Sequence, residues 1–295
     1  MTGDRSTAAD LTEVLADVAG VVGSQVVLLD RLPGGFQGGA MRVELAGGTV
    51  AVLKALPWAH PNHLEGARRA RRVVEHMRSR GYPTPAWLGV GATASHVWEL
   101  VEFVDGAPVP ELTPVLVQQL IEIVELQAGQ ATEREWDHWA YTWRVATGQE
   151  PATAHLPAYS VDVAALVDRI RRLCAGAAHP PESPDMVHAD LSIGNVLVRD
   201  GAVVAVVDIG AAGGGTRAID LTTLQWYTFS HALTEARDLL RAKIVELVGW
   251  EGAAVLLSNH ILHMLEFPIR HGRHDVVPGV IVQGHQALDE LQALR

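Results

Sequence analysis

Short glycine-containing links between β-rich runs near the N-terminus limit what this chain can fold into. Three runs rich in valine and leucine lie at Val26–Leu32, Ala40–Leu45 and Thr49–Leu56. The links between them contain Pro33-Gly34-Gly35 and Gly47-Gly48. Parallel strands need crossover connections of about a dozen residues or more. Links this short therefore predict an antiparallel meander.

The sequence after the meander predicts a change from strands to helices. One further helix and two further strands are expected at Leu64–Arg80, Trp87–Gly91 and His96–Val104. Asp105-Gly106 and the prolines that follow then interrupt the pattern. Beyond them, helices are expected at Pro114–Ala128, Val161–Cys174, Ala218–His231, Thr234–Val248, Gly252–Leu265 and Gly279–Leu294. We predict an α+β chain with a small β-sheet lobe over residues 1–104 and a larger, mainly helical lobe over residues 105–295.

The run His188-Ala189-Asp190-Leu191-Ser192-Ile193-Gly194-Asn195 carries the strongest chemical signal. Two apolar segments around Asp200-Gly201 predict a hairpin after it, and Asp208 follows the second segment. This spacing can bring the oxygen atoms of Asp190, Asn195 and Asp208 together. Oxygen ligands suit Mg²⁺, and a carboxylate that binds no metal can accept a proton from a hydroxyl group. Asp190 suits the second role, and Asn195 and Asp208 suit the first.

Two features of the predicted meander suit phosphate groups. Between the first two strands, Gly34, Gly35 and Gly38 allow backbone N–H groups to approach a polyphosphate closely. Lys54 is the only lysine in the meander and lies in the middle of its third strand. A lysine at that place can pair with the α- and β-phosphates of a nucleotide.

Taken together, these motifs resemble those of the aminoglycoside phosphotransferase family, whose members have a protein-kinase-like fold of two lobes. The segment Val101-Glu102-Phe103-Val104-Asp105-Gly106 resembles the hinge of that family, and Asp208-Ile209-Gly210 resembles its metal-binding triplet. The resemblance implies a kinase of small molecules that uses ATP or GTP and Mg²⁺.

The resemblance also assigns roles to single residues. It implies that Asp190 is the catalytic base, that Asn195 and Asp208 hold Mg²⁺, and that Lys54 contacts phosphate. The nucleotide would further contact the loop of Gly34, Gly35 and Gly38 and the hinge backbone at Glu102 and Val104. His188 would orient the catalytic loop.

The chain departs from the family pattern at two places. Ala189 stands where the family usually has glycine, a mild change if the backbone angles there are ordinary. The helix that should supply a glutamate to Lys54 offers Glu65 and Glu75, and their spacing does not choose between them. If neither reaches Lys54, another acidic residue or the nucleotide alone must hold it.

Charge suggests the class of acceptor. The chain has 34 acidic and 23 basic residues and a net charge of −11, which excludes a binder of nucleic-acid backbones and favours a cationic ligand. Glu133, Asp137 and Glu266 are candidate contacts to such a ligand, because carboxylates and nearby tryptophans recognise ammonium groups. Trp136, Trp139 and Trp143 have helical spacing, however, and such a stripe of tryptophans more often packs in a helical core. An aminoglycoside or another basic antibiotic is the expected acceptor, and no partner beyond this small molecule is implied.

The same motifs are also compatible with two other functions. A metabolic kinase of the choline or homoserine type shares the same motifs, and a nucleotide-binding pseudokinase would have no need for all of them.

No apolar run approaches the roughly 18 residues of a membrane span. The single cysteine, Cys174, and the lack of a signal-peptide pattern predict a cytoplasmic protein. The oligomeric state is not predicted.

Overall fold

The computed structural model describes residues 8–32, 40–132, 136–229 and 233–295. The chain divides into two compact units. Unit 1 contains Met1–Ala107 and Val204–Ala211, and unit 2 contains Pro108–Val203 and Ala212–Arg295. The boundary predicted after residue 104 lies close to the end of the first segment. The return of residues 204–211 to unit 1 was not foreseen.

A five-stranded antiparallel sheet forms the centre of unit 1, with the strand order β1-β2-β3-β5-β4. Its strands are β1 (Val26–Arg31), β2 (Ala40–Leu45), β3 (Thr49–Pro57), β4 (Trp87–Ala92) and β5 (His96–Glu102). Each pairing is antiparallel. The meander and the two later strands are therefore confirmed, and β5 inserts between β3 and β4.

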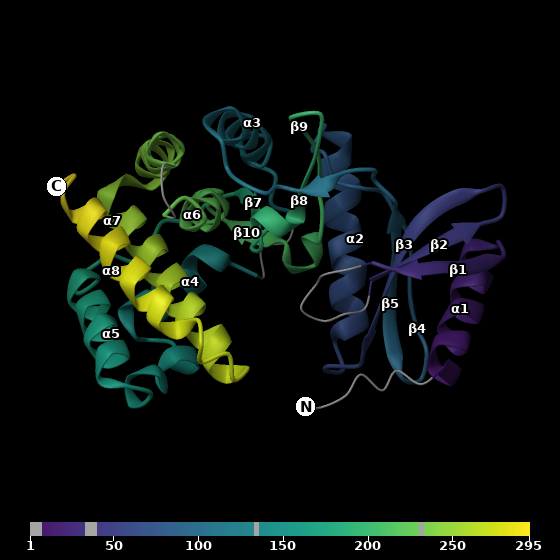
Figure 1. Ribbon diagram of the computed structural model, residues 1–295, viewed down its shortest axis with the longest axis horizontal. Helices are drawn as coiled ribbons and strands as arrows, with labels where there is room; N and C mark the ends of the chain where they lie inside the picture. The colour runs from purple at the N-terminus through teal and green to yellow at the C-terminus, as the bar shows by residue number, and fades with distance from the viewer. Residues whose placement is uncertain (1–7, 33–39, 133–135, 230–232) are drawn as a thin grey trace. The chain divides into compact units, whose positions relative to one another are not determined.

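The sheet has a helix on each face, α1 (Ala8–Val22) and α2 (His63–Ser79). The helices lie on opposite sides of the sheet in Figure 1. Because side chains alternate along a strand, every second residue faces α1. The apolar cluster on that face contains Val14, Val18, Met41, Val43, Ala51, Leu53, Trp98 and Leu100. The intervening residues of β3 and β5, Lys54 among them, face the side of α2.

The segment 204–211 belongs to unit 1 although it follows 96 residues that do not. Val206 donates its backbone N–H to Pro83 O at 2.6 Å. The 3-10 helix Ile209–Ala211 follows directly. This return places Asp208 in the same unit as Lys54.

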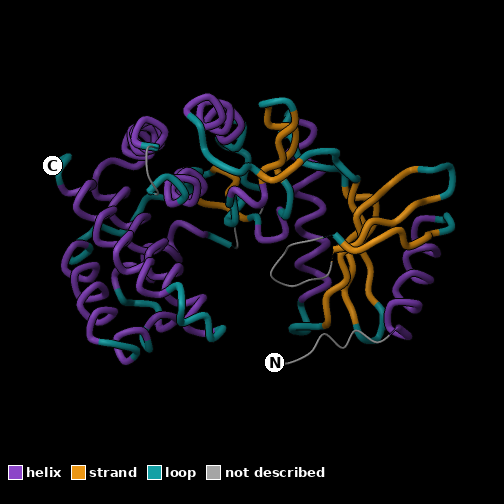
Figure 2. The backbone as a smooth tube through the Cα atoms, in the orientation of Figure 1, coloured by secondary structure: helices purple, strands orange, loops and turns teal. Residues whose placement is uncertain are grey.

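Unit 2 is mainly helical, as Figure 2 shows. Its helices are α3 (Pro114–Glu125), α4 (His138–Thr147), α5 (Val161–Leu173), α6 (Ala218–Trp226), α7 (Thr234–Arg270) and α8 (Val277–Gln292). The two helices expected at 234–248 and 252–265 form the single helix α7, which has a kink at Gly249 (φ 69°, ψ 176°). Helix α4 was not predicted. Among the described residues, no helix is long and apolar enough to span a membrane.

Short strands flank the predicted catalytic loop in the sequence. Strand β7 (Asp185–Val187) pairs antiparallel with β10 (Gly213–Gly215). The strands β8 (Val196–Arg199) and β9 (Ala202–Val206) are joined by Asp200-Gly201, as the sequence predicts for a hairpin. Strand β6 (Ala107–Pro108) follows the hinge segment. The loop 188–195 thus runs from the end of β7 to the start of β8.

Candidate active site

In unit 1, Lys54 and Asp208 form an ion pair. The Lys54 Nζ atom lies 2.7 Å from Asp208 Oδ1, and a quarter of the lysine side chain is exposed. Lys54 is fixed in the middle of β3, and Asp208 lies two residues after the end of β9. Two residues that are 154 positions apart in the sequence therefore meet, and both are predicted to serve the phosphate end of a nucleotide.

A second carboxylate lies beside this pair. Glu99 on β5 is directly opposite Lys54 on β3 in the register of the sheet. Burial raises the pKa of Glu99 to about 7, the charge of Lys54 opposes that rise, and the charge of Asp208 adds to it. Sequence reasoning missed Glu99, although a glutamate inside the apolar run from His96 to Val101 was a usable signal.

The two glutamates that the sequence offered as partners of Lys54 are engaged elsewhere. Glu65 lies 3.3 Å from Arg72 and 3.9 Å from Arg68, and Glu75 lies 2.9 Å from Arg71. The side chains of Glu65 and Glu75 are 60% and 58% exposed. Among the described residues, neither glutamate forms an ion pair with Lys54.

The predicted hinge lies at the end of the sheet. Glu102 is the last residue of β5, and Val104 follows two positions later. The backbone N–H of Glu102 donates to Ala86 O at 2.8 Å, and its carboxylate accepts from Ala86 N at 3.1 Å. These bonds fix the hinge at its β5 end. The glycines of the proposed phosphate loop, Gly34, Gly35 and Gly38, lie outside the described residues.

In unit 2, Asn195 braces the side chain of Asp190. Its amide Nδ2 donates to Asp190 O at 2.8 Å and to Asp190 Oδ2 at 3.0 Å. Ser192 N also donates to Asp190 O at 2.8 Å, and Asp190 N donates to His188 Nδ1 at 3.3 Å. The loop therefore closes on itself and leaves Asp190 exposed at its tip.

A buried aspartate holds the backbone of this loop. Asp220 at the start of α6 is fully buried and accepts hydrogen bonds from His188 N at 2.7 Å and from Ala189 N at 2.9 Å. Gln127 Nε2 donates to the same carboxylate at 3.0 Å. Burial raises the pKa of Asp220 to about 7, and these three donors oppose the rise.

The backbone at Ala189 is left-handed. Its φ is 69°, a region that residues with a Cβ atom rarely adopt. The replacement of the family's glycine by alanine is therefore not the mild change expected for ordinary angles. The two hydrogen bonds to Asp220 hold the peptide groups on each side of His188 in place, which explains how the strained conformation persists.

The residues proposed for Mg²⁺ have suitable donor atoms. Because Asn195 uses its amide nitrogen on Asp190, its carbonyl oxygen points away from that residue. Lys54 contacts one oxygen of Asp208, so the second oxygen of this half-exposed carboxylate can serve another cation. Amide and carboxylate oxygens are the ligands that Mg²⁺ prefers. The donor set therefore fits the ion.

Of the three acidic residues predicted on the acceptor side, the structure describes Asp137 and Glu266. Asp137 is the N-cap of α4, and its Oδ1 accepts from Trp139 N at 2.9 Å and Ala140 N at 3.1 Å. It therefore has a structural task, which sequence reasoning did not assign. Glu133 lies outside the described residues. Trp139 is buried, whereas Trp136 is 57% exposed.

Glu266, the other predicted acidic residue that the structure describes, lies on α7. It forms an ion pair of 3.1 Å with Arg270. One turn before it, His263 has a lowered pKa because the surrounding protein desolvates its ring, although water still reaches part of it. The charges of Glu266 and Asp190 oppose this lowering, so both carboxylates lie within electrostatic range of His263.

Two tyrosines extend this group. Burial raises the pKa of Tyr141 on α4, and the charges of Glu150 and Glu266 raise it further. Burial also raises the pKa of Tyr227, next to Asp190 and hydrogen-bonded to Ser192. Tyr227, directly after α6, and His263 on α7 are therefore within electrostatic range of Asp190, and Tyr141 on α4 is within range of Glu266. His263 and Tyr227 carry no sequence motif that could have identified them.

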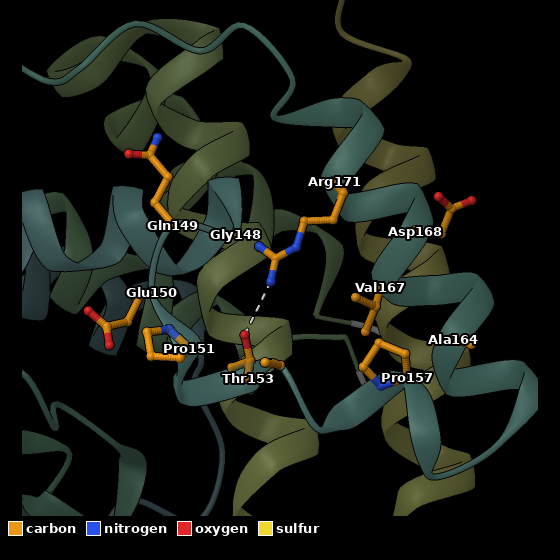
Figure 3. Close-up of a pocket in the computed structure, with 11 residues that line it drawn as sticks. Gly148, Gln149, Glu150, Pro151, Thr153, Pro157, Ala164, Val167, Asp168 and Arg171 are labelled. Carbon is orange, nitrogen blue, oxygen red and sulfur yellow. Dashed lines mark hydrogen bonds between the residues drawn. The ribbon is translucent and has the colours of Figure 1, made fainter.

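A separate pocket of about 540 Å³ lies between the C-terminal end of α4 and α5 (Figure 3). Arg171 lies along it and donates to Ala146 O at 2.6 Å, to Thr153 Oγ1 at 3.2 Å and to Val145 O. Its charge therefore stabilises the carbonyl end of α4. None of the described residues predicted for catalysis, metal or nucleotide lines this pocket.

Comparisons with known proteins agree with the motifs and the fold. The model of the phosphotransferase enzyme family (APH) matches residues 30–256. No curated protein sequence matches the chain. Many solved structures are similar, and the three described below have less than 25% identity, so these likenesses show the fold alone. They have the protein-kinase-like α+β fold that the sequence predicts.

The first is aminoglycoside phosphotransferase APH(4)-Ia, with 19% identity over 95% of this chain and 98% of that chain and a TM-score of 0.71. The second is a putative fructosamine-3-kinase from Thermobifida fusca, with 24% identity over 94% and 98% and a TM-score of 0.64. The third is macrolide 2'-phosphotransferase MphH from Brachybacterium faecium, with 18% identity over 93% and 97% and a TM-score of 0.59.

Proposed function

The chain belongs to the phosphotransferase enzyme family, and from that premise we propose that it transfers the γ-phosphoryl group of ATP or GTP to a hydroxyl group of a small cationic molecule. The observation that carries this proposal is the catalytic loop. Asp220 holds the backbone of the two residues before Asp190, and Asn195 holds the side chain of Asp190. The carboxylate of Asp190 remains exposed, so that an acceptor can reach it.

Each residue of the site then has a defined task. Asp190 orients the acceptor hydroxyl and takes its proton as the new phosphorus–oxygen bond forms, while the bond from the γ-phosphorus to the β-phosphate oxygen breaks and releases ADP or GDP. Lys54 binds phosphate oxygens and keeps the donor in place. Asn195 and Asp208 would hold Mg²⁺, which when bound neutralises charge on the phosphates. Glu102 and Val104 would bind the base through their backbone, and Gly34, Gly35 and Gly38 would contact the phosphates.

The acceptor is a basic, hydroxylated molecule in this proposal. Glu266, Glu150 and the ring of Tyr141 can bind an ammonium group by charge and cation–π contact. The net charge of −11 favours the approach of such a cation. In complexes of APH(4)-Ia the ligands are ADP and hygromycin B. An aminoglycoside-like or other basic antibiotic is therefore the first candidate, and Glu133 would add a further carboxylate. The enzyme would act in the cytoplasm.

A panel of acceptors tests this function. The protein is incubated with Mg²⁺ and either ATP or GTP, together with aminoglycosides, macrolides, fructosamines, choline and homoserine, and the products are analysed by mass spectrometry. We expect at least one cationic compound to gain a phosphate group. Phosphorylation of choline or homoserine alone would favour a metabolic kinase. Nucleotide binding without transfer to any compound would favour a pseudokinase.

A further inference from the structure

The strand register of unit 1 gives Lys54 a carboxylate neighbour that is not on α2. Lys54 on β3 is paired with Glu99 on β5, and the adjacent pair is Leu53 with Leu100. Leu53 and Leu100 are completely buried in the cluster that packs on α1. Side chains alternate along a strand, so Lys54 and Glu99 both project from the opposite face. Directly opposed residues of antiparallel strands have Cβ atoms about 4.5–5.5 Å apart.

Lys54 supplies the favourable charge that acts on Glu99, although among the described residues the Lys54 ammonium group forms its ion pair with Asp208 and none within 4.0 Å with Glu99. Glu99 is partly buried, and a carboxylate withdrawn from water is costly unless a cation pairs with it. The two charges that act on Glu99 are those of Lys54, which is favourable, and Asp208, which is unfavourable. The glutamates of α2 do not compete for Lys54, since arginines of the same helix bind both of them.

Asp208 contacts Lys54 through one oxygen and is also a proposed ligand of Mg²⁺, so its negative charge is shared between two cations. Glu99 has no such second role. It comes from a central strand whose position is fixed by hydrogen bonds on both sides, to β3 and to β4. A rigid strand keeps a side chain in place more accurately than a loop does.

We propose that Glu99 positions Lys54 for the phosphate groups of the nucleotide and takes the place of a glutamate from α2. The assignment rests on the proposed function, since it concerns the same nucleotide site. Glu99 is a positioning residue, because it acts through Lys54 and touches neither substrate.

A double-mutant cycle on nucleotide binding tests this assignment. Calorimetry gives the Kd of ATP or GTP, whichever binds the wild-type protein more tightly, in the presence of Mg²⁺. The variants are Glu99→Gln, Lys54→Met and the double variant. We expect Glu99→Gln to raise the Kd by about tenfold, and to have almost no further effect in the Lys54→Met protein. Equal effects of Glu99→Gln in both backgrounds would show a merely structural role and overturn the assignment.

The matched control removes both glutamates of α2. The variant carrying Glu65→Gln and Glu75→Gln should leave the Kd of the nucleotide within about twofold of the wild-type value. If this variant weakens binding and Glu99→Gln does not, a residue of α2 holds Lys54 and the assignment is wrong. If Glu99→Gln fails to fold, Glu99→Asp replaces it. We expect this variant to raise the Kd of the nucleotide by a smaller factor, and to have no effect on the Kd in the Lys54→Met background.

A spectroscopic readout is available because Lys54 and Lys243 are the only lysines in the sequence. Lysine labelled with ¹³C at Cε therefore gives two signals, and Lys243→Arg identifies them. Lys243 lies in unit 2, where it pairs with Glu125 at 3.0 Å and Glu246 at 2.7 Å. Glu99→Gln should shift the signal of Lys54 and leave that of Lys243 in place. An unchanged Lys54 signal would contradict a direct interaction.

These measurements separate the assignment from the proposed function. They need no acceptor and can be made on a protein that transfers no phosphate. If the acceptor panel gives no product, the proposed function is refuted, but the Kd values of the nucleotide still test the role of Glu99. Additive effects in the cycle would overturn the role of Glu99 alone. A wild-type protein that binds no nucleotide would overturn both.

Discussion

Replacing Ala189 by glycine should stabilise the protein, which is the reverse of the usual effect of this substitution. Ala189 has a φ of 69° next to Asp190. A left-handed conformation costs a residue with a Cβ atom about 1–2 kcal/mol, and glycine avoids that cost. Glycine also gives the unfolded chain more freedom, which costs about 0.4–1 kcal/mol. The difference predicts a gain of about 0.5–1 kcal/mol for Ala189→Gly.

Scanning calorimetry of the nucleotide-free protein measures this gain. For a chain of this size we expect the Tm to rise by about 1–2 °C. Ala178 provides the control, since it is exposed in a loop and is not among the described residues with positive φ. Ala178→Gly should lower the Tm by about 1 °C. A fall of the Tm in both variants would refute the conclusion that Ala189 is strained.

Two further predictions concern α7. Burial, together with the charge of the nearby His263, lowers the pKa of His260 from 6.5 to about 3. The unfolded chain therefore binds a proton below pH 6.5 that the folded protein does not, and stability is lost as the pH falls from about 6.5 toward 3. The variant His260→Phe keeps a ring against Trp226 and removes this titrating group. Urea titrations at about pH 7 and pH 5 should show that its free energy of unfolding falls by about 2 kcal/mol less than that of the wild-type protein. An equal fall in both proteins would contradict this prediction. Glu266→Gln should raise the KM of a cationic acceptor by about tenfold and leave the KM of the nucleotide unchanged, whereas equal changes in both values would place Glu266 outside the acceptor site.

The sheet of unit 1 and the residues of the catalytic loop could be predicted because their signals are local. Glycine-containing links dictate an antiparallel meander, and the spacing of Asp190, Asn195 and Asp208 is visible in the sequence. The register of the strands could not be predicted in this way. The pairing of Lys54 with Glu99 depends on β5 inserting beside β3, a contact between segments that are 45 residues apart. No periodicity within either strand specifies which residues are opposed.

Other features were missed because one pattern has two readings. Trp136, Trp139 and Trp143 suited both a ligand site and a buried helix face, and the structure contains a helix, α4, for which Asp137 is the cap. The left-handed backbone at Ala189 could not be read from the residue type, because alanine normally avoids it. The two helices expected at 234–248 and 252–265 are one helix, because the backbone bends at Gly249 and the helix continues beyond the kink.

The kinetics of Asp190→Asn test the central claim most directly. Asparagine keeps the size of the side chain but cannot take a proton from the acceptor hydroxyl. On an acceptor identified in the panel, we expect kcat to fall by about 10³-fold while the Kd of the magnesium nucleotide stays within about threefold of the wild-type value. A variant that keeps near-wild-type kcat would contradict the account, because Asp190 would then not be the base for phosphoryl transfer.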